Sequence, residues 1–282
     1  MTYIPIIGAL ALASGTIFQR KILKQREISI KKYFVMEFIA ISLVMLPLIY
    51  FFWEIKSEAF LLKNVILFSS VIVASILANI FAFKSMKWEK INNIEPAKVL
   101  EPLLVILLAI LFSFFFEGFD KNPKILVPAI LSVFALIFSH IKKRHLDFNK
   151  YFIFAIIGSF FFALELILSR LILDYFNPIT FYFLRCLILA IFGIAIFHPS
   201  FKNVKIKTKF YTLIVGAIWV VFRIITYWGY LKLGVIFTTL IMLLGPVFVY
   251  LFAHIFLKEK YNWKNILVSA IIIASVVYAT VG

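Results

Sequence analysis

One stretch decides how the chain folds: INNIEPAKVLEPLLVILLAILFSFFFE, residues 91–117. Its second half is apolar apart from Ser113, which is typical of a helix that is buried or faces lipid. Just upstream, Glu95, Lys98 and Glu101 recur every three residues, so they line one side of the same predicted helix. Pro102 interrupts that helix between its charged half and its apolar half.

A second stretch has the same design: VIFTTLIMLLGPVFVYLFAHIFLKE, residues 235–259. An offset of 144 residues places Pro102 on Pro246. Both apolar runs also end in an acid, Glu117 in the first and Glu259 in the second. The two stretches therefore predict that the chain is built from two copies of one unit.

The composition predicts a protein that crosses a membrane many times. Hydrophobic residues make up 64% of the 282 residues and charged residues 15%, whereas soluble domains are roughly half apolar and about a quarter charged. A spanning helix needs about 20 residues. We expect an all-α integral protein of the cell membrane with ten transmembrane helices, at about 3–19, 33–53, 62–84, 92–116, 124–141, 151–170, 178–197, 210–230, 235–256 and 264–281.

The net charge of +16 does not indicate a nucleic-acid partner, because the basic residues gather in the breaks between the predicted spans. Membrane topology and anionic lipid headgroups explain them better. The single cysteine, Cys186, excludes an internal disulfide and a cysteine-rich metal site. We therefore expect the lipid bilayer and a small solute as partners, in a monomer or homodimer, with no cofactor and no metal.

The repeat extends along the whole chain. The tripeptide IIG at 6–8 matches IIG at 156–158, Glu37 lies opposite Arg185, and Asn79 lies opposite Arg223. The repeats are predicted to cover residues 1–145 and 146–282, with five spans each. Since five is an odd number, the second copy must sit upside down relative to the first, which is the inverted-repeat plan of many secondary transporters.

This pattern resembles the EamA-type branch of the drug/metabolite transporter superfamily. The resemblance rests on the five-plus-five spans, the proline and closing Glu of each fourth span, and the segments 177–180, 231–234 and 245–246. It implies a ten-span transporter with both termini inside the cell. Two positions depart from the family: residues 13–15 are Ala-Ser-Gly where many members have Trp-Gly, and Glu37 stands where an Arg is common. The substrate of any one member therefore does not carry over.

The loop charges predict the opposite orientation. The breaks after odd-numbered spans contain 20 Lys and Arg, and those after even-numbered spans contain six. Because cytoplasmic loops collect positive charge, this count places both termini outside.

Polar side chains within spans are costly in lipid and usually face a cavity or a partner. Glu95 can instead lie at the membrane interface, whereas Glu101 is about 9 Å deeper along the helix. Trp219, Arg223 and Tyr227 are spaced to form an aromatic–cation–aromatic stripe on one helix face.

Structural ion pairs are the alternative for the buried charges. Glu37 can pair with Arg185, and Glu165 can carry a proton or pair with Arg185 or Arg223. We expect eight residues to converge on one polar chamber and bind substrate: Asn79, Glu95, Lys98, Glu101, Glu165, Arg185, Arg223 and Tyr227.

We expect a secondary active transporter that moves a small polar or amphipathic metabolite, preferably an amino-acid-like solute, by alternating access. The buried acids leave proton coupling open. A membrane-embedded lipid-modifying enzyme and a non-transporting scaffold are the alternatives; the first would need acid clusters that the chain does not show. The phosphate-binding GxxxxGK[ST] loop of a primary pump is absent from the sequence.

Overall fold

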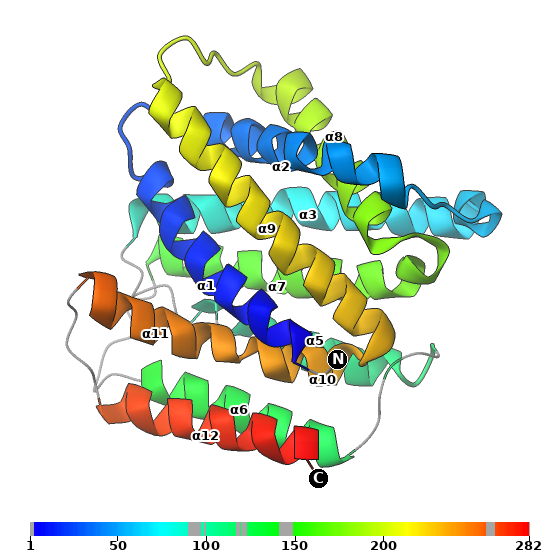
Figure 1. The fold of residues 1–282 in the computed structure, drawn as a ribbon, viewed down its shortest axis with the longest axis vertical. Helices are drawn as coiled ribbons and strands as arrows, with labels where there is room; N and C mark the ends of the chain where they lie inside the picture. Colours follow the sequence, from blue (N-terminus) through cyan, green and yellow to red (C-terminus); the bar gives the residue numbers. More distant parts are fainter. Residues whose placement is uncertain are drawn as a thin grey trace.

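The computed structural model describes residues 3–89, 97–98, 100–116, 119, 123–140, 149–257 and 263–281. Over these residues the protein is a bundle of helices, and its only β-type pairing is an isolated bridge (Figure 1). The first half contains α1 (Ile4–Leu23), α2 (Ile30–Phe52), α3 (Leu62–Trp88), α5 (Leu100–Phe112) and α6 (Pro123–His140). The second half contains α7 (Lys150–Ile172), α8 (Pro178–Phe197), α9 (Ile206–Lys232), α10 (Val235–Met242), α11 (Leu244–Leu257) and α12 (Trp263–Val281).

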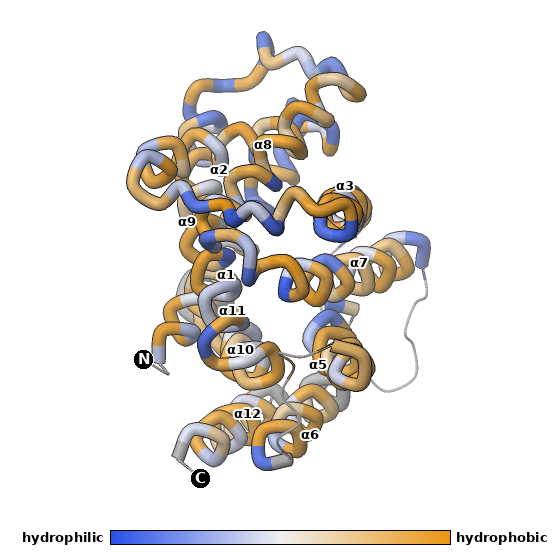
Figure 2. The backbone as a smooth tube through the Cα atoms, turned by 90° about the vertical axis from the view of Figure 1, so that its right-hand side faces the viewer, coloured by the Kyte–Doolittle hydropathy of each residue, from blue (hydrophilic) through white to orange (hydrophobic). Residues whose placement is uncertain are grey.

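These helices occupy the ten predicted spans. Six of them, α1, α2, α3, α7, α8 and α9, are long and apolar enough to cross a membrane, and four shorter apolar stretches occupy the remaining spans. The helices are largely hydrophobic along their length in Figure 2. The all-α membrane class is therefore confirmed, whereas the count of ten crossings stays a prediction. The N and C marks both lie in the lower half of the molecule in both views (Figures 1 and 2).

Local sequence signals set where several helices begin. Ser29 caps α2 by accepting a hydrogen bond from the Lys32 N–H, and Asn149 caps α7 by accepting from Tyr151 and Phe152. Asn177 caps α8 directly before Pro178, which occupies the first helical position. A side-chain oxygen at the cap accepts a hydrogen bond from a backbone N–H that has no partner within the helix. Proline is tolerated at the first helical position because the N–H that it lacks would have no helical partner in any case.

The second repeat proline breaks its helix. Pro246 lacks an N–H, so the carbonyl four residues earlier, that of Met242, cannot receive a helical hydrogen bond. Met242 is the last residue of α10, and α11 begins at Leu244. Pro102 lies in the first turn of α5, where the first N–H groups have no helical partner in any case.

Helix packing follows the repeat. α3 packs along α7, and α1 packs along α9; α2 packs along α8, and α6 along α12. α5 lies against α7, as α1 lies against α10 and α11. In the repeat, α1 corresponds to α7, α2 to α8, α3 to α9, α5 to α10 and α11, and α6 to α12. Replacing every helix by its counterpart turns each of these packing contacts into another contact of the set or leaves it unchanged. This is the pattern that a two-fold repeat predicts. The division at residues 145 and 146 lies outside the described residues and stays a prediction.

The backbones of α3 and α7 approach each other closely. A Cβ atom added to Gly158 of α7 would lie 3.1 Å from the backbone nitrogen of Ala82 on α3. Small residues permit such close packing of membrane helices. Gly158 therefore fixes how near α3 and α7 can lie.

Two connecting segments pair with each other at one end of the bundle. Ile55, after α2, forms an antiparallel bridge with Phe176, which precedes α8. The Lys56 N–H donates to the Tyr175 carbonyl at 2.9 Å, and the Asn177 N–H donates to the Glu54 carbonyl at 3.2 Å. We call residues 54–56 and 175–177 the loop pair. It joins the first half of the chain to the second.

Candidate functional site

A cavity of about 210 Å³ lies where both halves of the chain meet. Both repeat prolines, Pro102 and Pro246, line it, so the feature that first revealed the repeat also borders the cavity. Its wall contains residues from α1, α2, α3, α5, α7, α8, α9, α10 and α11. Five of the predicted site residues line it: Asn79, Lys98, Glu101, Arg185 and Arg223.

Two more predicted residues lie directly behind this wall. Glu165 and Tyr227 are both fully buried and bind the side chain of Arg185. The eighth predicted residue, Glu95, lies outside the described residues. The structure therefore brings seven of the eight around one cavity, five by lining it and two by bonding to Arg185.

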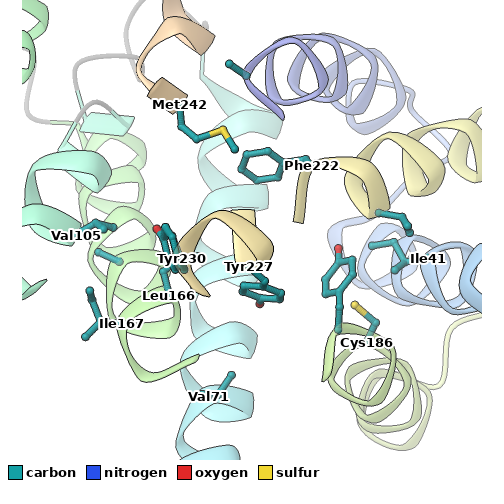
Figure 3. Packing of buried hydrophobic residues seen from close by; sticks show 14 of the residues in the cluster. Ile41, Val71, Val105, Leu166, Ile167, Cys186, Phe222, Tyr227, Tyr230 and Met242 are labelled. Atoms are coloured by element: carbon teal, nitrogen blue, oxygen red, sulfur yellow. The ribbon is translucent and has the colours of Figure 1, made fainter. Parts of the chain in front are cut away.

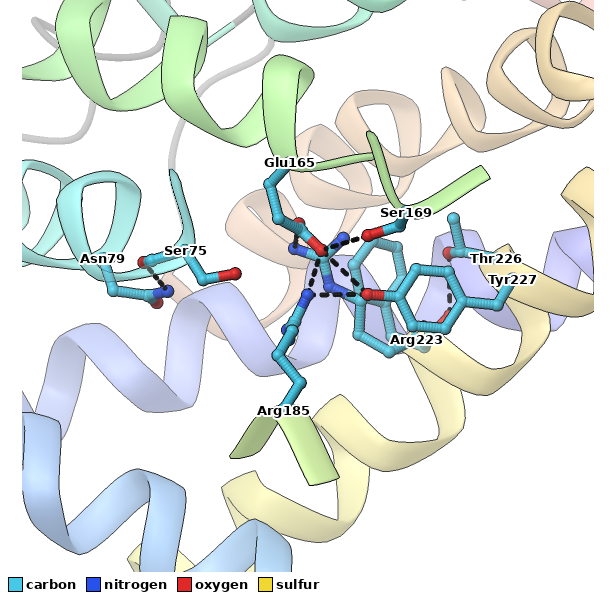
Figure 4. Close-up of polar contacts among 9 residues, drawn as sticks. Ser75, Asn79, Glu165, Ser169, Arg185, Arg223, Thr226 and Tyr227 are labelled. Atoms are coloured by element: carbon cyan, nitrogen blue, oxygen red, sulfur yellow. Dashed lines mark hydrogen bonds and ion pairs between the residues drawn. The ribbon is translucent and has the colours of Figure 1, made fainter. Parts of the chain in front are cut away.

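Glu165 is the centre of a buried polar cluster (Figure 4). Arg185 Nη1 and the Tyr227 hydroxyl donate to Glu165 Oε1, the latter at 2.8 Å. Ser169, one turn later on α7, donates to the same oxygen at 3.1 Å. Arg223 Nη2 lies 3.1 Å from Glu165 Oε2. One carboxylate thus receives two guanidinium groups, which leaves an excess positive charge in this cluster.

Tyr227 is hydrogen-bonded to both members of the Glu165–Arg185 ion pair. Its hydroxyl accepts a hydrogen bond from Arg185 Nη1 at 2.6 Å and donates its own proton to Glu165. Figure 3 shows Tyr227 and Tyr230 surrounded by buried apolar side chains. Charge-assisted bonds in such surroundings are strong only when the partners are held in place.

The rings that contact Arg223 differ from the two that the predicted aromatic stripe would supply. The Arg223 guanidinium lies over the rings of Phe222 and Phe162, at 5.6 Å and 5.8 Å from their centroids. Tyr227 instead stacks with Arg185, whose guanidinium is 6.0 Å from its ring. The sequence spacing placed the three side chains on one face of α9, but it could not show that a ring from α7 would take the place of Tyr227.

Asn79 lies apart from the charge cluster. Its amide donates to the Ser75 carbonyl of its own helix at 2.8 Å, as Figure 4 shows. It lines the cavity, yet no bond to its repeat partner Arg223 is recorded among the described residues.

The row on the fourth span reaches the cavity through Lys98 and Glu101. Glu101 is within electrostatic range of Arg223, Glu165 and Lys98. Lys98 and Glu101 thus line the cavity, and the role of this row in a substrate path stays a prediction.

The structure corrects the pairing suggested for Glu37. Arg185 binds Glu165 and not Glu37. Glu37 is 2% exposed, and its Oε1 accepts from Gln19 Nε2 at 3.0 Å and from the Tyr33 hydroxyl at 3.3 Å. It also lines the cavity. Matching repeat positions suggested an ion pair, but Arg185 pairs with Glu165 on α7, and Glu37 is bound by Gln19 of α1 and Tyr33 of its own helix.

Other residues with a polar group also line the wall, and sequence reasoning did not place them there. They are Thr16, Gln19, Ser85, Ser159, Tyr182, Trp219, Thr226, Tyr230 and Thr239. All of them are neutral and lie within otherwise apolar helices, so charge gives no signal for them. Within the described residues, no group of three or more His, Cys, Asp and Glu is arranged to hold a metal.

The sequence of the second half and the fold of the chain both match known proteins. The model of the EamA-like transporter family matches residues 149–281. A solved crystal structure superposes with a TM-score of 0.70, covering 99% of this chain and 94% of that one at 16% sequence identity. At that identity the likeness shows a shared fold. No curated protein matches the chain.

Proposed function

We propose, from the match of the EamA-like transporter family model to residues 149–281, that the chain is a secondary active transporter of a small solute that carries an anionic group. Transport would proceed by alternating access of the central cavity to the two sides of the membrane. The family and the multi-pass helical fold favour transport over a lipid-modifying enzyme or a scaffold.

One observation carries the anionic preference. Arg223 is 6% exposed and lines the cavity. Its Nη2 faces Glu165, whereas Nη1 has no hydrogen-bond partner among the described residues. An unsatisfied buried donor costs about 1–3 kcal/mol, and more when the group is charged. A carboxylate or similar anion entering the cavity would satisfy it.

The charge cluster holds Arg223 in position. Glu165 binds Arg223 from one side, and the rings of Phe162 and Phe222 contact its guanidinium. A guanidinium fixed in this way loses little side-chain freedom when a solute binds. We therefore assign Arg223 as the anchor for the anionic group and Glu165 as its positioning residue.

Proton coupling forms part of the proposal through Glu101. This carboxyl group lines the cavity beside Arg223, Glu165 and Lys98. Protonation of Glu101 and binding of an anionic solute at Arg223 would each change the charge that the other meets. This is one way to couple the movement of the solute to that of a proton.

The test is uptake of labelled amino acids and carboxylates into proteoliposomes, with and without a pH gradient. Arg223→Gln should abolish uptake or change its solute preference while the protein stays folded. Arg170→Gln is the matched control, because Arg170 is also buried but pairs with Asp174 at 2.7 Å and does not line the cavity. Unchanged uptake in Arg223→Gln, with reduced thermal stability, would show that Arg223 is a structural ion-pair member.

A further inference from the structure

We infer that a second pocket, at the end of the bundle where α2 begins and α3 ends, binds the headgroup of an anionic phospholipid. We call it the basic pocket; it is formed mainly by residues 26–32, the last turns of α3 and the end of α8. Its volume of about 850 Å³ lies in the range of ligand pockets, about 300–1,000 Å³. It shares no lining residue with the central cavity, so the inference is independent of the proposed transport function.

The basic pocket lies at the depth of the lipid headgroups. Residues 26–32 lead from α1 into the first turn of α2, and Lys84 and Lys87 lie in the last two turns of α3. Phe197 is the last residue of α8. Because α2, α3 and α8 are long and apolar enough to cross a membrane, their ends reach its surface. Trp88, 62% exposed at the end of α3, is of the residue type that gathers at this depth.

The lining carries a large excess of positive charge. Five cations line the pocket: Arg26, Lys31, Lys32, Lys84 and Lys87. Glu27 is the one acid among the described lining residues, and its Oε1 also lies 4.0 Å from Lys205 Nζ outside the pocket. Glu89, the next acid after α3, accepts from Asn149 Nδ2 at 2.6 Å and does not line the pocket. Five cations against one acid leave four positive charges in excess.

Aromatic rings hold two of these cations in place. Lys84 Nζ lies over the rings of Phe81 and Phe154, 5.8 Å and 5.4 Å from their centroids. Lys31 Nζ lies over the ring of Phe197, 5.8 Å from its centroid. A ring face attracts an ammonium group but does not neutralise its charge. Both lysines are therefore positioned and still able to bind an anion.

Lys87 has a structural role as well. Its Nζ donates to the carbonyls of Leu23 and Ile28, so it ties the segment after α1 to the end of α3. This contact keeps the two sides of the basic pocket together. The tests below therefore leave Lys87 unchanged.

The combination of charge and apolar surface favours a lipid over a soluble anion. Phe34, Ile80 and Phe197 line the same pocket as the cations. A phospholipid presents phosphate oxygens that accept from Lys and Arg, followed by apolar chains, and basic pockets between membrane helices are a known form of headgroup site. The distribution of charge between the two sides of the membrane explains basic loops in general. It does not require five cations to line one pocket.

The experiment is a lipid titration of the purified full-length protein in detergent, followed by native mass spectrometry. Palmitoyl-oleoyl phosphatidylglycerol and palmitoyl-oleoyl phosphatidylcholine have the same chains and one phosphate each, but only the first has a net negative charge. The wild-type protein should bind the phosphatidylglycerol about tenfold or more tightly at one site. Equal binding of the two lipids would overturn the inference, and this comparison needs no variant.

The double variant Lys31→Gln, Lys84→Gln removes one cation from each side of the pocket. It should bind phosphatidylglycerol about tenfold or more weakly and phosphatidylcholine within about twofold of the wild-type protein. Arg26→Gln with Lys32→Gln is a second variant with the same expected result, and unfolding in phosphatidylcholine nanodiscs checks that each variant is folded. The matched control is Lys207→Gln with Lys209→Gln. These exposed lysines lie at the same end of the bundle, and Lys207 also lies over a ring, that of Tyr211, but neither lines the pocket.

The control variant should keep the wild-type preference. If it loses phosphatidylglycerol as strongly as the pocket variants do, binding follows net charge and the site is overturned. Inorganic phosphate and glycerol phosphate separate a lipid from a soluble ligand. Neither should displace phosphatidylglycerol at a concentration equal to that of the lipid. Displacement at that concentration would show that the pocket binds a soluble phosphate and would overturn its assignment to lipid.

Discussion

Arg185 binds Glu165 on α7, although the repeat places Arg185 opposite Glu37 on α2. The two halves of the chain have therefore diverged in their polar centres. The second half contributes a carboxylate with two guanidinium groups. The first half contributes a carboxylate held by neutral donors.

Glu165→Gln should destabilise the protein strongly. The substitution leaves Arg185 and Arg223 buried without their shared counter-ion, and breaking a buried pair in this way costs about 3–5 kcal/mol. The measurement is thermal or denaturant unfolding of the purified protein. Glu58→Gln, at an exposed position in the 3₁₀ helix Ser57–Phe60, is the control and should leave stability unchanged. Equal stability of the two variants would contradict the central role of Glu165.

Gly158→Ala should destabilise the protein more than the same change at its repeat partner, Gly8. The new methyl group at 158 would meet the backbone of Ala82, which cannot move without shifting α3. At Gly8 it would meet the flexible end of the Met242 side chain. We expect a loss of about 1–3 kcal/mol for Gly158→Ala, measured by unfolding of both variants. A larger loss at Gly8 would argue against the close packing of α3 and α7.

A disulfide across the loop pair should stop transport. Ile55 and Phe176 are joined by the antiparallel bridge. Phe176 packs on Phe181, and Phe181 packs on Tyr227, with ring centroids 5.6 Å and 5.3 Å apart. The loop pair is thus connected by aromatic contacts to the charge cluster. If this end of the bundle opens during alternating access, the loop pair must separate.

The variant for this test carries Ile55→Cys and Phe176→Cys, with Cys186→Ala to remove the native thiol. Oxidation should form the cross-link and abolish uptake, and a reductant should restore uptake. Each single-cysteine variant is a control that should be insensitive to oxidation. Uptake at the uncross-linked rate, with the disulfide formed, would show that this end of the bundle stays closed during transport.

The orientation of the chain is tested at Lys205, an exposed residue directly before α9. The loop charges predict that this position faces the cytoplasm, with both termini outside. In a background lacking Cys186, a cysteine substituted for Lys205 should be protected from a membrane-impermeant thiol reagent in intact cells and should react after permeabilisation. Rapid labelling in intact cells would instead support the inside termini that the family resemblance implies.

Much of the helical framework was predictable because the signals are local. Runs of apolar residues predict the positions of the helices. The break between α10 and α11 lies within a span predicted as continuous, and the missing N–H of Pro246 explains it. The residues around the cavity were also largely predictable, because a charged side chain within an apolar span must face away from lipid. Arg185, Arg223 and Glu101 all satisfy this rule by lining the cavity.

The partners of these charges were not predictable in the same way. Glu165, Arg185 and Arg223 lie on three different helices, and their bonds depend on how each helix is rotated about its axis. Sequence spacing fixes which residues share a face of one helix, but it does not fix that rotation. For the same reason the sequence offers a pair with Arg185 as one alternative for Glu37 and does not predict its position in the cavity wall.

The central claim is that the cavity carries a solute by alternating access, and solute counterflow tests it most directly. Proteoliposomes are loaded with unlabelled leucine or phenylalanine and diluted into a trace of the labelled amino acid. A carrier exchanges internal for external solute, so the account predicts that label accumulates transiently above its equilibrium level. Arg170→Gln should behave in the same way, and Arg223→Gln should show no accumulation. Entry of label at a rate independent of the internal solute, equal in the wild-type protein and in Arg223→Gln, would contradict the account.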